Sequence, residues 1–456
     1  MISCIYLLSF AILVTNIVKS IKKDKYLSIS NVFLFTLSFL YLLVPGLMFL
    51  TGTANSTISN VIVSSTIDDR VTAYLYIMTM VICVIVAKNS LFEKKQQNYQ
   101  LDNLYLDINQ AACEKSIIYS VCIKWFCALF VIGILGFLMM VSQIGFWGFI
   151  TYSGASRGEG AELSGSMIGY GKFLAKFMIA SLSPGMMVYE TTKRRFFKYI
   201  LIGIFVLSFM LEIFIAGKSN FILFLLPFFM RFMGRKNKGI DINKIVVLGV
   251  VMLSLVFLLD NWFYSLEMGE SVSQYRKDWT FDRYFMRYLH EYLYPYSNVL
   301  LSKKMNIEFG YRLFIDYLAV FINFIPATFL NGFQIKLLYP EVTKTYEMIS
   351  GSKSAGVPAD YLTFCIRQLG IIGVISISII CSKLLQFVDA HLARVKKHCE
   401  LLHINAYHML TCCSAFGFII VLIEPYSAIS TQPILFTSVL IIIQLSNKFR
   451  IEEKGK

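Results

Sequence analysis

The chain has 456 residues, of which 57% are hydrophobic and only 15% are charged, and its mean hydropathy is +0.64. This much apolar surface exceeds what a water-soluble core can bury, so the composition excludes an ordinary soluble domain and indicates a polytopic membrane protein. The net charge of +14 comes from short basic clusters between apolar segments, a pattern typical of membrane loops and not of nucleic-acid binding.

The first apolar segment, residues 2–18, resembles a signal peptide in length, but no basic stretch precedes it and no small-residue cleavage site follows it. We therefore expect it to be retained as the first transmembrane helix. From there to the C-terminus, apolar segments of about 17 to 25 residues predict about eleven such helices, within a range of ten to twelve. They lie near 3–19, 30–50, 71–88, 117–141, 168–189, 197–216, 219–233, 244–260, 362–386, 404–423 and 434–447.

The expected fold is all-α, with one long polar segment between two sets of helices. Residues 1–260 form the N-terminal transmembrane bundle, 261–361 the long polar segment, and 362–456 the C-terminal helices and a basic tail. The ten cysteines lie mostly in or beside apolar segments, without CxxC or histidine-spaced sets. The sequence therefore predicts neither a disulfide framework nor a metal site, and no cofactor motif is present.

Basic residues follow alternate apolar segments, and this sets the expected orientation. Because lysine and arginine concentrate in cytoplasmic loops, the N-terminus and the long polar segment are expected outside, and the C-terminal tail inside. The clusters are Lys19 to Lys25, Lys94-Lys95, Lys193 to Arg195, Arg235 to Lys238, Arg394 to Lys397 and the tail from Lys448.

Residues 312–330 are the ambiguous segment. It is apolar enough to cross a membrane, but it contains Asp316, Asn323 and Pro326. A crossing would move the later basic clusters to the outside. We therefore expect amphipathic or re-entrant helices in the external segment, with a crossing at 312–330 as the alternative.

Two basic residues stand in external loops that otherwise contain few of them. Arg157 lies in the Gly/Ser-rich stretch 151–160, where a guanidinium has a geometry suited to phosphate; the alternative is a surface pair with Glu159 or Glu162. Lys218 lies in a tight turn between two apolar segments. It either places a positive charge at the mouth of an outward cavity or extends to the lipid headgroups.

The stretch 282–291 carries the strongest candidates for chemistry. At helical spacing Arg283, Arg287 and His290 share one face, beside a row of aromatic residues. Two arginines suit a diphosphate, and His290 or the adjacent Glu291 suits transfer of a proton from a sugar hydroxyl. The alternative is an amphipathic helix lying on the membrane.

Three further residues are candidate substrate or diphosphate ligands in or next to the long polar segment. Arg312 opens the ambiguous segment, Lys353 lies in a Gly/Ser-rich stretch that ends at Asp360, and Tyr361 is the last residue before the next apolar segment. The stretch around Lys353 is either a substrate-ordering loop or a plain linker.

These features together resemble the bacterial O-antigen polymerase (Wzy) family, which joins oligosaccharide repeat units. Besides the hydropathy outline, the resemblance rests on short motifs in the same order. A lysine at 218 and an alanine at 327 depart from the family pattern, which has arginine at both places. The motifs are Arg157 in its loop, Gly217-Lys218-Ser219, Phe309-Gly310-Tyr311 with Phe324-Ile325-Pro326, and Gly356 to Tyr361 followed by Gly370 to Gly373.

The resemblance implies a GT-C-like, metal-independent, inverting membrane glycosyltransferase at the periplasmic face of the bacterial inner membrane. Its substrates would be undecaprenyl-diphosphate-linked oligosaccharides embedded among membrane lipids, and a chain-length regulator protein would be a further partner. In this scheme Arg157 acts in catalysis beside His290 or Glu291. An O-antigen ligase and a lipid-linked oligosaccharide flippase are the alternatives.

Overall fold

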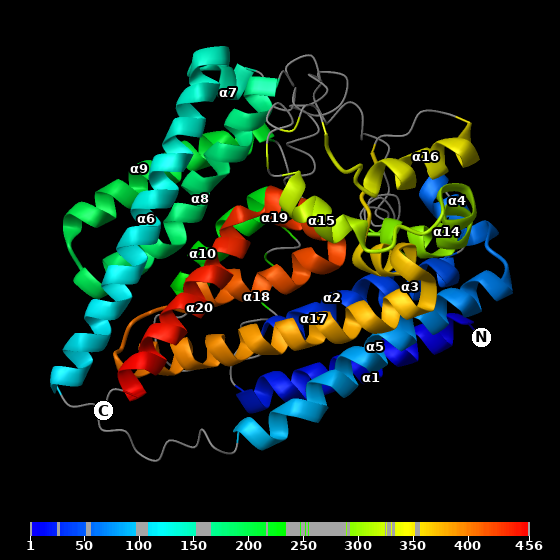
Figure 1. The fold of residues 1–456 in the computed structure, drawn as a ribbon, viewed down its shortest axis with the longest axis horizontal. Coiled ribbons are helices and arrows are strands. Elements are labelled where there is room, and N and C mark those ends of the chain that lie inside the picture. The colour runs from blue at the N-terminus through cyan, green and yellow to red at the C-terminus, as the bar shows by residue number, and fades with distance from the viewer. Residues whose placement is uncertain are drawn as a thin grey trace.

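The computed structural model describes residues 2–24, 28–51, 56–96, 108–151, 166–215, 218–233, 292–323, 333–351 and 356–454, with single positions between them (Figure 1). Every regular element in this part of the chain is a helix. The expected all-α class is therefore confirmed for the described residues. Of the stretch 282–291, the described residues include only Leu289, so the candidates Arg283, Arg287, His290 and Glu291 lie outside them.

The N-terminal helices form one side of the molecule. α1 (Ile2–Asp24) is followed by one continuous helical segment made of α2 (Ile29–Ser38), the π-helical turn η1 (Phe39–Leu43) and α3 (Val44–Thr51). The short α4 (Thr57–Ser64) then leads to α5 (Ile67–Gln96). Figure 1 shows α1 and α5 running beside α17 (Tyr361–Leu401).

A second group of helices contains one pair, α6 and α8, that packs with very close backbone contact. It comprises α6 (Ile108–Ile144), α7 (Gly148–Thr151), α8 (Ser166–Thr192), α9 (Arg195–Ile215) and α10 (Lys218–Met233). A Cβ atom at Gly133 of α6 would lie 2.2 Å from the backbone nitrogen of Met178, and one at Gly136 would lie 2.3 Å from that of Ala175. Glycine is required at both positions because any side chain would force α6 and α8 apart.

The long polar segment contributes three described helices at one end of the bundle: α14 (Tyr294–Phe309), α15 (Ile315–Ile322) and α16 (Tyr339–Ser350). After α17, the chain continues through α18 (Tyr407–Leu422), α19 (Pro425–Thr431) and α20 (Pro433–Lys454). α15 has only eight residues, about 12 Å, which is too short to cross a bilayer. Because α15 covers only part of 312–330, the expectation that this segment does not cross stays a prediction.

Seven helices in the described part of the chain are long and apolar enough to span a membrane. They are α1, the segment from α2 to α3, α5, α6, α9, α17 and α20, and they support a polytopic membrane protein. Four other segments that were expected to span are not among these seven. α8 contains Lys172 and Lys176, and α10 and α18 are only 16 residues long. The segment 244–260 lies almost wholly outside the described residues. The expected total of eleven remains a prediction.

The described basic clusters lie near one end of the bundle, where polar contacts join helices that are distant in sequence. Glu190, at the end of α8, pairs with Lys193 and Arg231. Glu114, near the start of α6, accepts a hydrogen bond from His398 at the end of α17, 2.9 Å away. We call this the basic end. α14, α15, α16 and α19 lie at the opposite end (Figure 1).

Candidate functional site

Arg312 lies at the centre of an ion-pair network that joins α15, α16 and α17. Its Nε and Nη2 atoms donate to the two carboxylate oxygens of Asp316, at 2.7 and 2.6 Å. Its Nη1 donates to Glu341 on α16 at 2.5 Å, and Nη2 also donates to the backbone carbonyl of Lys336. With 8% of its side chain exposed, Arg312 is held by the protein on every nitrogen of its guanidinium.

A second arginine, Arg367, shares the same glutamate from inside α17. Its Nη2 donates to the other carboxylate oxygen of Glu341 at 2.7 Å, and its Nη1 donates to Asn306 of α14. Next to it, Gln368 donates to Asp316 at 2.6 Å and accepts the backbone N–H of Phe314 at 2.8 Å. The four charged side chains of Arg312, Asp316, Glu341 and Arg367 balance, as burial requires.

A break in α17 makes room for these contacts. Leu369 and Gly370 leave the helical conformation, and Gly370 has a φ of +59°, which favours glycine. The carbonyls of Arg367 and Gln368 instead accept the backbone N–H groups of Arg312 and Leu313, at 2.9 and 3.2 Å. The chain before α15 is thereby bonded to the interrupted turn of α17.

Glu424 links this network to α19. Its carboxylate accepts the backbone N–H of Leu338 and the hydroxyl of Ser427, both at 3.1 Å, and the residue is 3% exposed. Burial raises the pKa of Glu424 to about 7, and the nearby Asp316 carboxylate acts in the same direction. A carboxyl with this pKa changes charge near neutral pH, and Glu424 is the residue that directly precedes α19.

A second group of charges lies where α8 meets α9 and the C-terminal end of α19. Lys176 donates from Nζ to the carbonyl of Thr431 at 3.0 Å. Lys176 and Lys172, one helical turn apart, both attract the carboxylate of Glu212 on α9, which is 3% exposed. In the described part of the chain one oxygen of that carboxylate has no hydrogen-bond partner. Beside Thr431, Gln432 donates to Asn220 near the start of α10.

A third polar cluster anchors the start of α17. Asp360 caps the helix by accepting the backbone N–H of Thr363 at 3.0 Å, and it also accepts from Tyr41 and from Asn298, the latter at 2.8 Å. Burial raises the pKa of Asp360, and these hydrogen bonds oppose the rise. Tyr346 of α16 donates to the Asn298 side chain at 2.9 Å, so the cluster ties α14 and α16 to α17.

The structure describes three of the nine site residues predicted from the sequence. Lys218 begins α10, close to Asn220. Arg312 lies in the ion-pair network, which favours a positioning role over direct contact with a ligand. Tyr361 is 3% exposed and packs edge-on against Phe33, with its hydroxyl 3.4 Å from the carbonyl of Ile377. The other six lie outside the described residues: Arg157, Arg283, Arg287, His290, Glu291 and Lys353.

Sequence reasoning did not select Lys172, Lys176, Glu212, Arg367 or Glu424. A usable signal existed for the lysines, because two charges four residues apart inside a predicted span at 168–189 are expensive unless they serve a purpose. Arg367 and Glu212 are likewise charged residues inside predicted spans, at 362–386 and 197–216, so the same argument applies to them. Among the described residues, no group of three His, Cys, Asp or Glu side chains is arranged to hold a metal ion.

No protein-family model, no curated protein and no solved structure matches this chain. The functional interpretation therefore rests on the chain's own residues, their positions in the fold and the resemblance in short motifs.

Proposed function

We propose that this protein is an integral-membrane glycosyltransferase that joins lipid-diphosphate-linked oligosaccharide repeat units into a surface polysaccharide. The proposal includes about eleven transmembrane helices in a GT-C-like arrangement, with the basic end in the cytoplasm and the opposite end at the periplasmic face of a bacterial inner membrane. An external site has no access to nucleotide sugars, so its donor must arrive already joined to a diphosphate.

One observation supports this proposal most directly: polar and charged side chains from distant segments gather around α19, at the end of the bundle opposite the basic clusters. Arg312 and Glu424 lie at the N-terminal side of α19, and Lys172 and Lys176 lie at its C-terminal side. α10, which Lys218 begins, meets the same place through Asn220. A reaction on a membrane-embedded lipid substrate needs such a composite site.

In the proposed mechanism the growing glycan on undecaprenyl diphosphate is the donor, and one new lipid-linked repeat unit is the acceptor. Arg157, Arg283, Arg287 and Lys218 neutralise the diphosphate, which gains negative charge as the glycosidic bond breaks. His290 or Glu291 takes the proton from the attacking hydroxyl, and direct displacement inverts the anomeric centre. Arg312 positions α15 and α16, while Lys172 and Lys176 add positive potential.

Deletion of the gene, followed by gel analysis of the surface glycan, tests the proposal. Core carrying a single repeat unit supports a polymerase. Core alone with accumulated lipid-linked polymer supports a ligase instead, and loss of all external units supports a flippase. Complementation with Arg157→Ala is expected to leave single repeat units at normal protein abundance, whereas Arg194→Ala, at the basic end, is expected to restore full-length polymer.

A further inference from the structure

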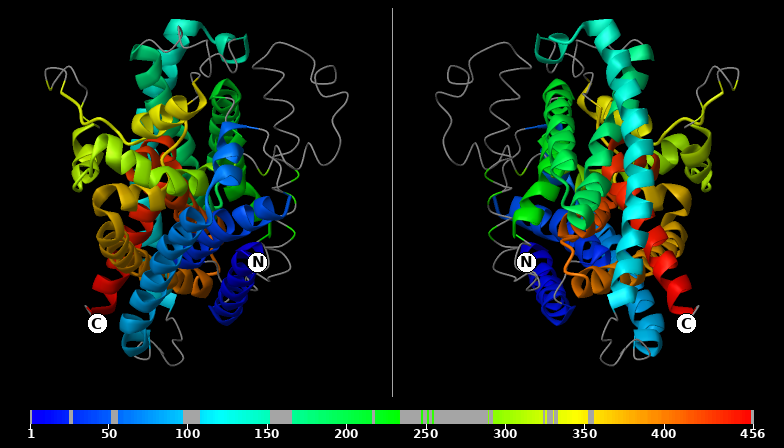
Figure 2. Two further views of the ribbon diagram at one scale, coloured as in Figure 1. Left: turned by 90° about the vertical axis from the view of Figure 1, so that its right-hand side faces the viewer. Right: turned by 90° about the vertical axis from the view of Figure 1, so that its left-hand side faces the viewer.

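A groove lies between α6 and α20, away from the α19 region. It has a volume of about 450 Å³ and is lined by Trp125 of α6 and, on α20, by Leu440, Ile443, Gln444, Asn447, Lys448 and Ile451. The right-hand view of Figure 2 shows α20 beside the lower part of α6. The proposed glycosyl transfer makes no use of this groove.

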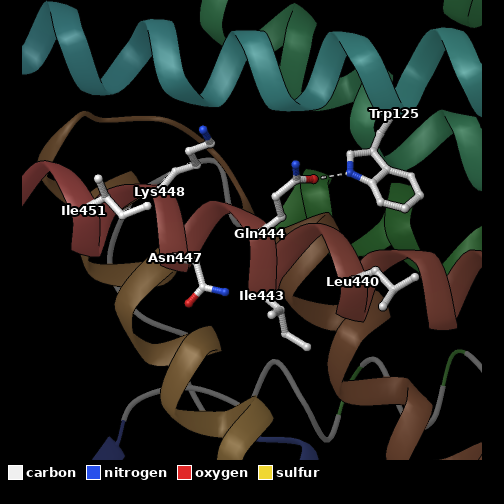
Figure 3. A pocket seen from close by; sticks show the side chains of 7 residues that line it. All are labelled: Trp125, Leu440, Ile443, Gln444, Asn447, Lys448 and Ile451. Atoms are coloured by element: carbon white, nitrogen blue, oxygen red, sulfur yellow. Dashed lines mark hydrogen bonds between the residues drawn. The ribbon is translucent and has the colours of Figure 1, made fainter.

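The walls of the groove combine apolar and polar chemistry in a fixed order. The indole N–H of Trp125 donates to the Gln444 side chain at 2.5 Å, and Figure 3 shows both Gln444 and Lys448 extending from α20 toward α6. Leu440 and Ile443 lie farther along α20 from the basic end, Asn447 and Lys448 lie nearer to it, and Ile451 follows one turn later. One part of the groove therefore suits a hydrocarbon chain, and the other suits a polar group.

The groove lies toward the basic end of the bundle. Glu452 accepts a hydrogen bond from Cys113 at this end, and Gln444 is eight residues before Glu452, about 12 Å along the helix. Tryptophan and lysine together are typical of the boundary between hydrocarbon and headgroups, where an amphipathic ring and a long cationic side chain both have suitable surroundings.

The exposed charged side chains that the structure describes beside the groove are positive. Lys124, which adjoins Trp125, is exposed, and so are Lys448 and Arg450 on α20. Among the side chains that the structure describes, two glutamates toward this end are already bonded: Glu452 accepts from Cys113, and the buried Glu114 accepts from His398. A ligand with a negatively charged headgroup therefore meets exposed cations and carboxylates that are already engaged.

We propose that this groove binds one anionic glycerophospholipid of the surrounding membrane. Its phosphate lies at Lys448 and the Asn447 amide, and one acyl chain lies along Leu440 and Ile443 beside the Trp125 ring. The anionic headgroup distinguishes this ligand from the bulk zwitterionic lipid, which would gain the same apolar contacts without the attraction to Lys448. The site is independent of the proposed glycosyl transfer, so either proposal can fail alone.

Quenching of tryptophan fluorescence by bromine-labelled lipids tests the site in the full-length protein. The purified protein is placed in bilayers that contain either brominated phosphatidylglycerol or brominated phosphatidylcholine, with identical acyl chains and equal mole fractions. The chain has four tryptophans, so the signal of Trp125 is obtained by subtracting that of the Trp125→Phe variant. The expected result is stronger quenching of Trp125 by phosphatidylglycerol.

The variant Lys448→Gln separates specific binding from general contact with lipid. It is expected to lower the preference for phosphatidylglycerol about fivefold, the factor expected of one lysine near a membrane surface. Lys198→Gln, an exposed lysine of α9 outside the groove, is expected to keep it. Should Lys448→Gln not fold, Leu440→Phe is the second variant, because its larger ring fills the groove without adding a tryptophan and is expected to abolish the preference. Equal quenching by both lipids in the native protein, or a preference that survives in the folded variant, would overturn the proposal.

Discussion

Glu341 and Arg367 form an ion pair, with 2.7 Å between Oε2 and Nη2, that joins α16 to the interior of α17. Arg367 is fully buried, whereas the glutamate side chain is 22% exposed and also pairs with Arg312. One carboxylate therefore pairs with two arginines, one within α17 and one in the segment before α15. This shared acid joins α16 to α17 and to the segment before α15, in addition to the Asp360 cluster that ties α14 and α16 to α17.

Replacement of Glu341 by alanine is expected to destabilise the protein severely. The change leaves the buried guanidinium of Arg367 without its carboxylate, and loss of one partner of a buried pair costs about 3–5 kcal/mol. Thermal unfolding of the purified protein in detergent measures the loss. Glu308→Ala, at an exposed position on α14, is the matched control and is expected to change stability by less than about 0.5 kcal/mol. Similar melting temperatures for both variants would contradict the importance of the pair.

Stability is expected to fall as the pH rises from about 4.5 to about 7, through the contribution of Glu424. Its folded-state pKa is raised to about 7, above the usual value of 4.5, so the folded state binds more protons than the unfolded state across this window. The stabilisation is thus present at low pH and lost as the carboxyl ionises.

The measurement is the difference in melting temperature between pH 5 and pH 7.5. Glu424→Gln, which cannot ionise, is expected to show a smaller decrease than the native protein over this interval. Glu308→Gln, which removes an exposed carboxyl, should retain the native decrease. An unchanged pH dependence in Glu424→Gln would show that other groups cause it.

Many of the helices could be predicted from the sequence, because a helix that spans a membrane needs a continuous apolar segment of sufficient length, and basic residues mark where such segments end. Most of the predicted spans overlap described helices. These properties depend on local composition, which the sequence displays.

The partners of the charged residues could not be predicted in the same way. The sequence does not indicate that Arg312 pairs with Glu341, because the two residues are 29 positions apart. In the structure they lie 2.5 Å from each other. Gly370 lies inside the predicted span 362–386, and its sequence surroundings indicate a continuous helix. In the structure, however, Gly370 interrupts α17, and two carbonyls become available to Arg312 and Leu313. Such contacts depend on tertiary geometry that no local pattern encodes.

Gly133→Ala is expected to destabilise the packing of α6 on α8. The added methyl group would lie 2.2 Å from the backbone nitrogen of Met178, so the helices must separate, at a cost of about 1–3 kcal/mol. Gly203→Ala is the control, because a Cβ at that position of α9 meets no atom within 4 Å, and it should cause no loss. Thermal unfolding in detergent compares the two variants, and equal stability would refute the close-packing argument.

The two lysines of α8 provide a test of activity. If Lys172 and Lys176 add positive potential at the site of the leaving diphosphate, replacing both with methionine should lower polymer output on the order of tenfold, or about 1.4 kcal/mol in the barrier. Gel analysis of the surface glycan, with protein abundance measured in parallel, provides the readout. Lys198→Met, which removes an exposed lysine of α9, should leave polymer length unchanged. Full-length polymer from the double variant would restrict the two lysines to neutralising Glu212 and holding Thr431.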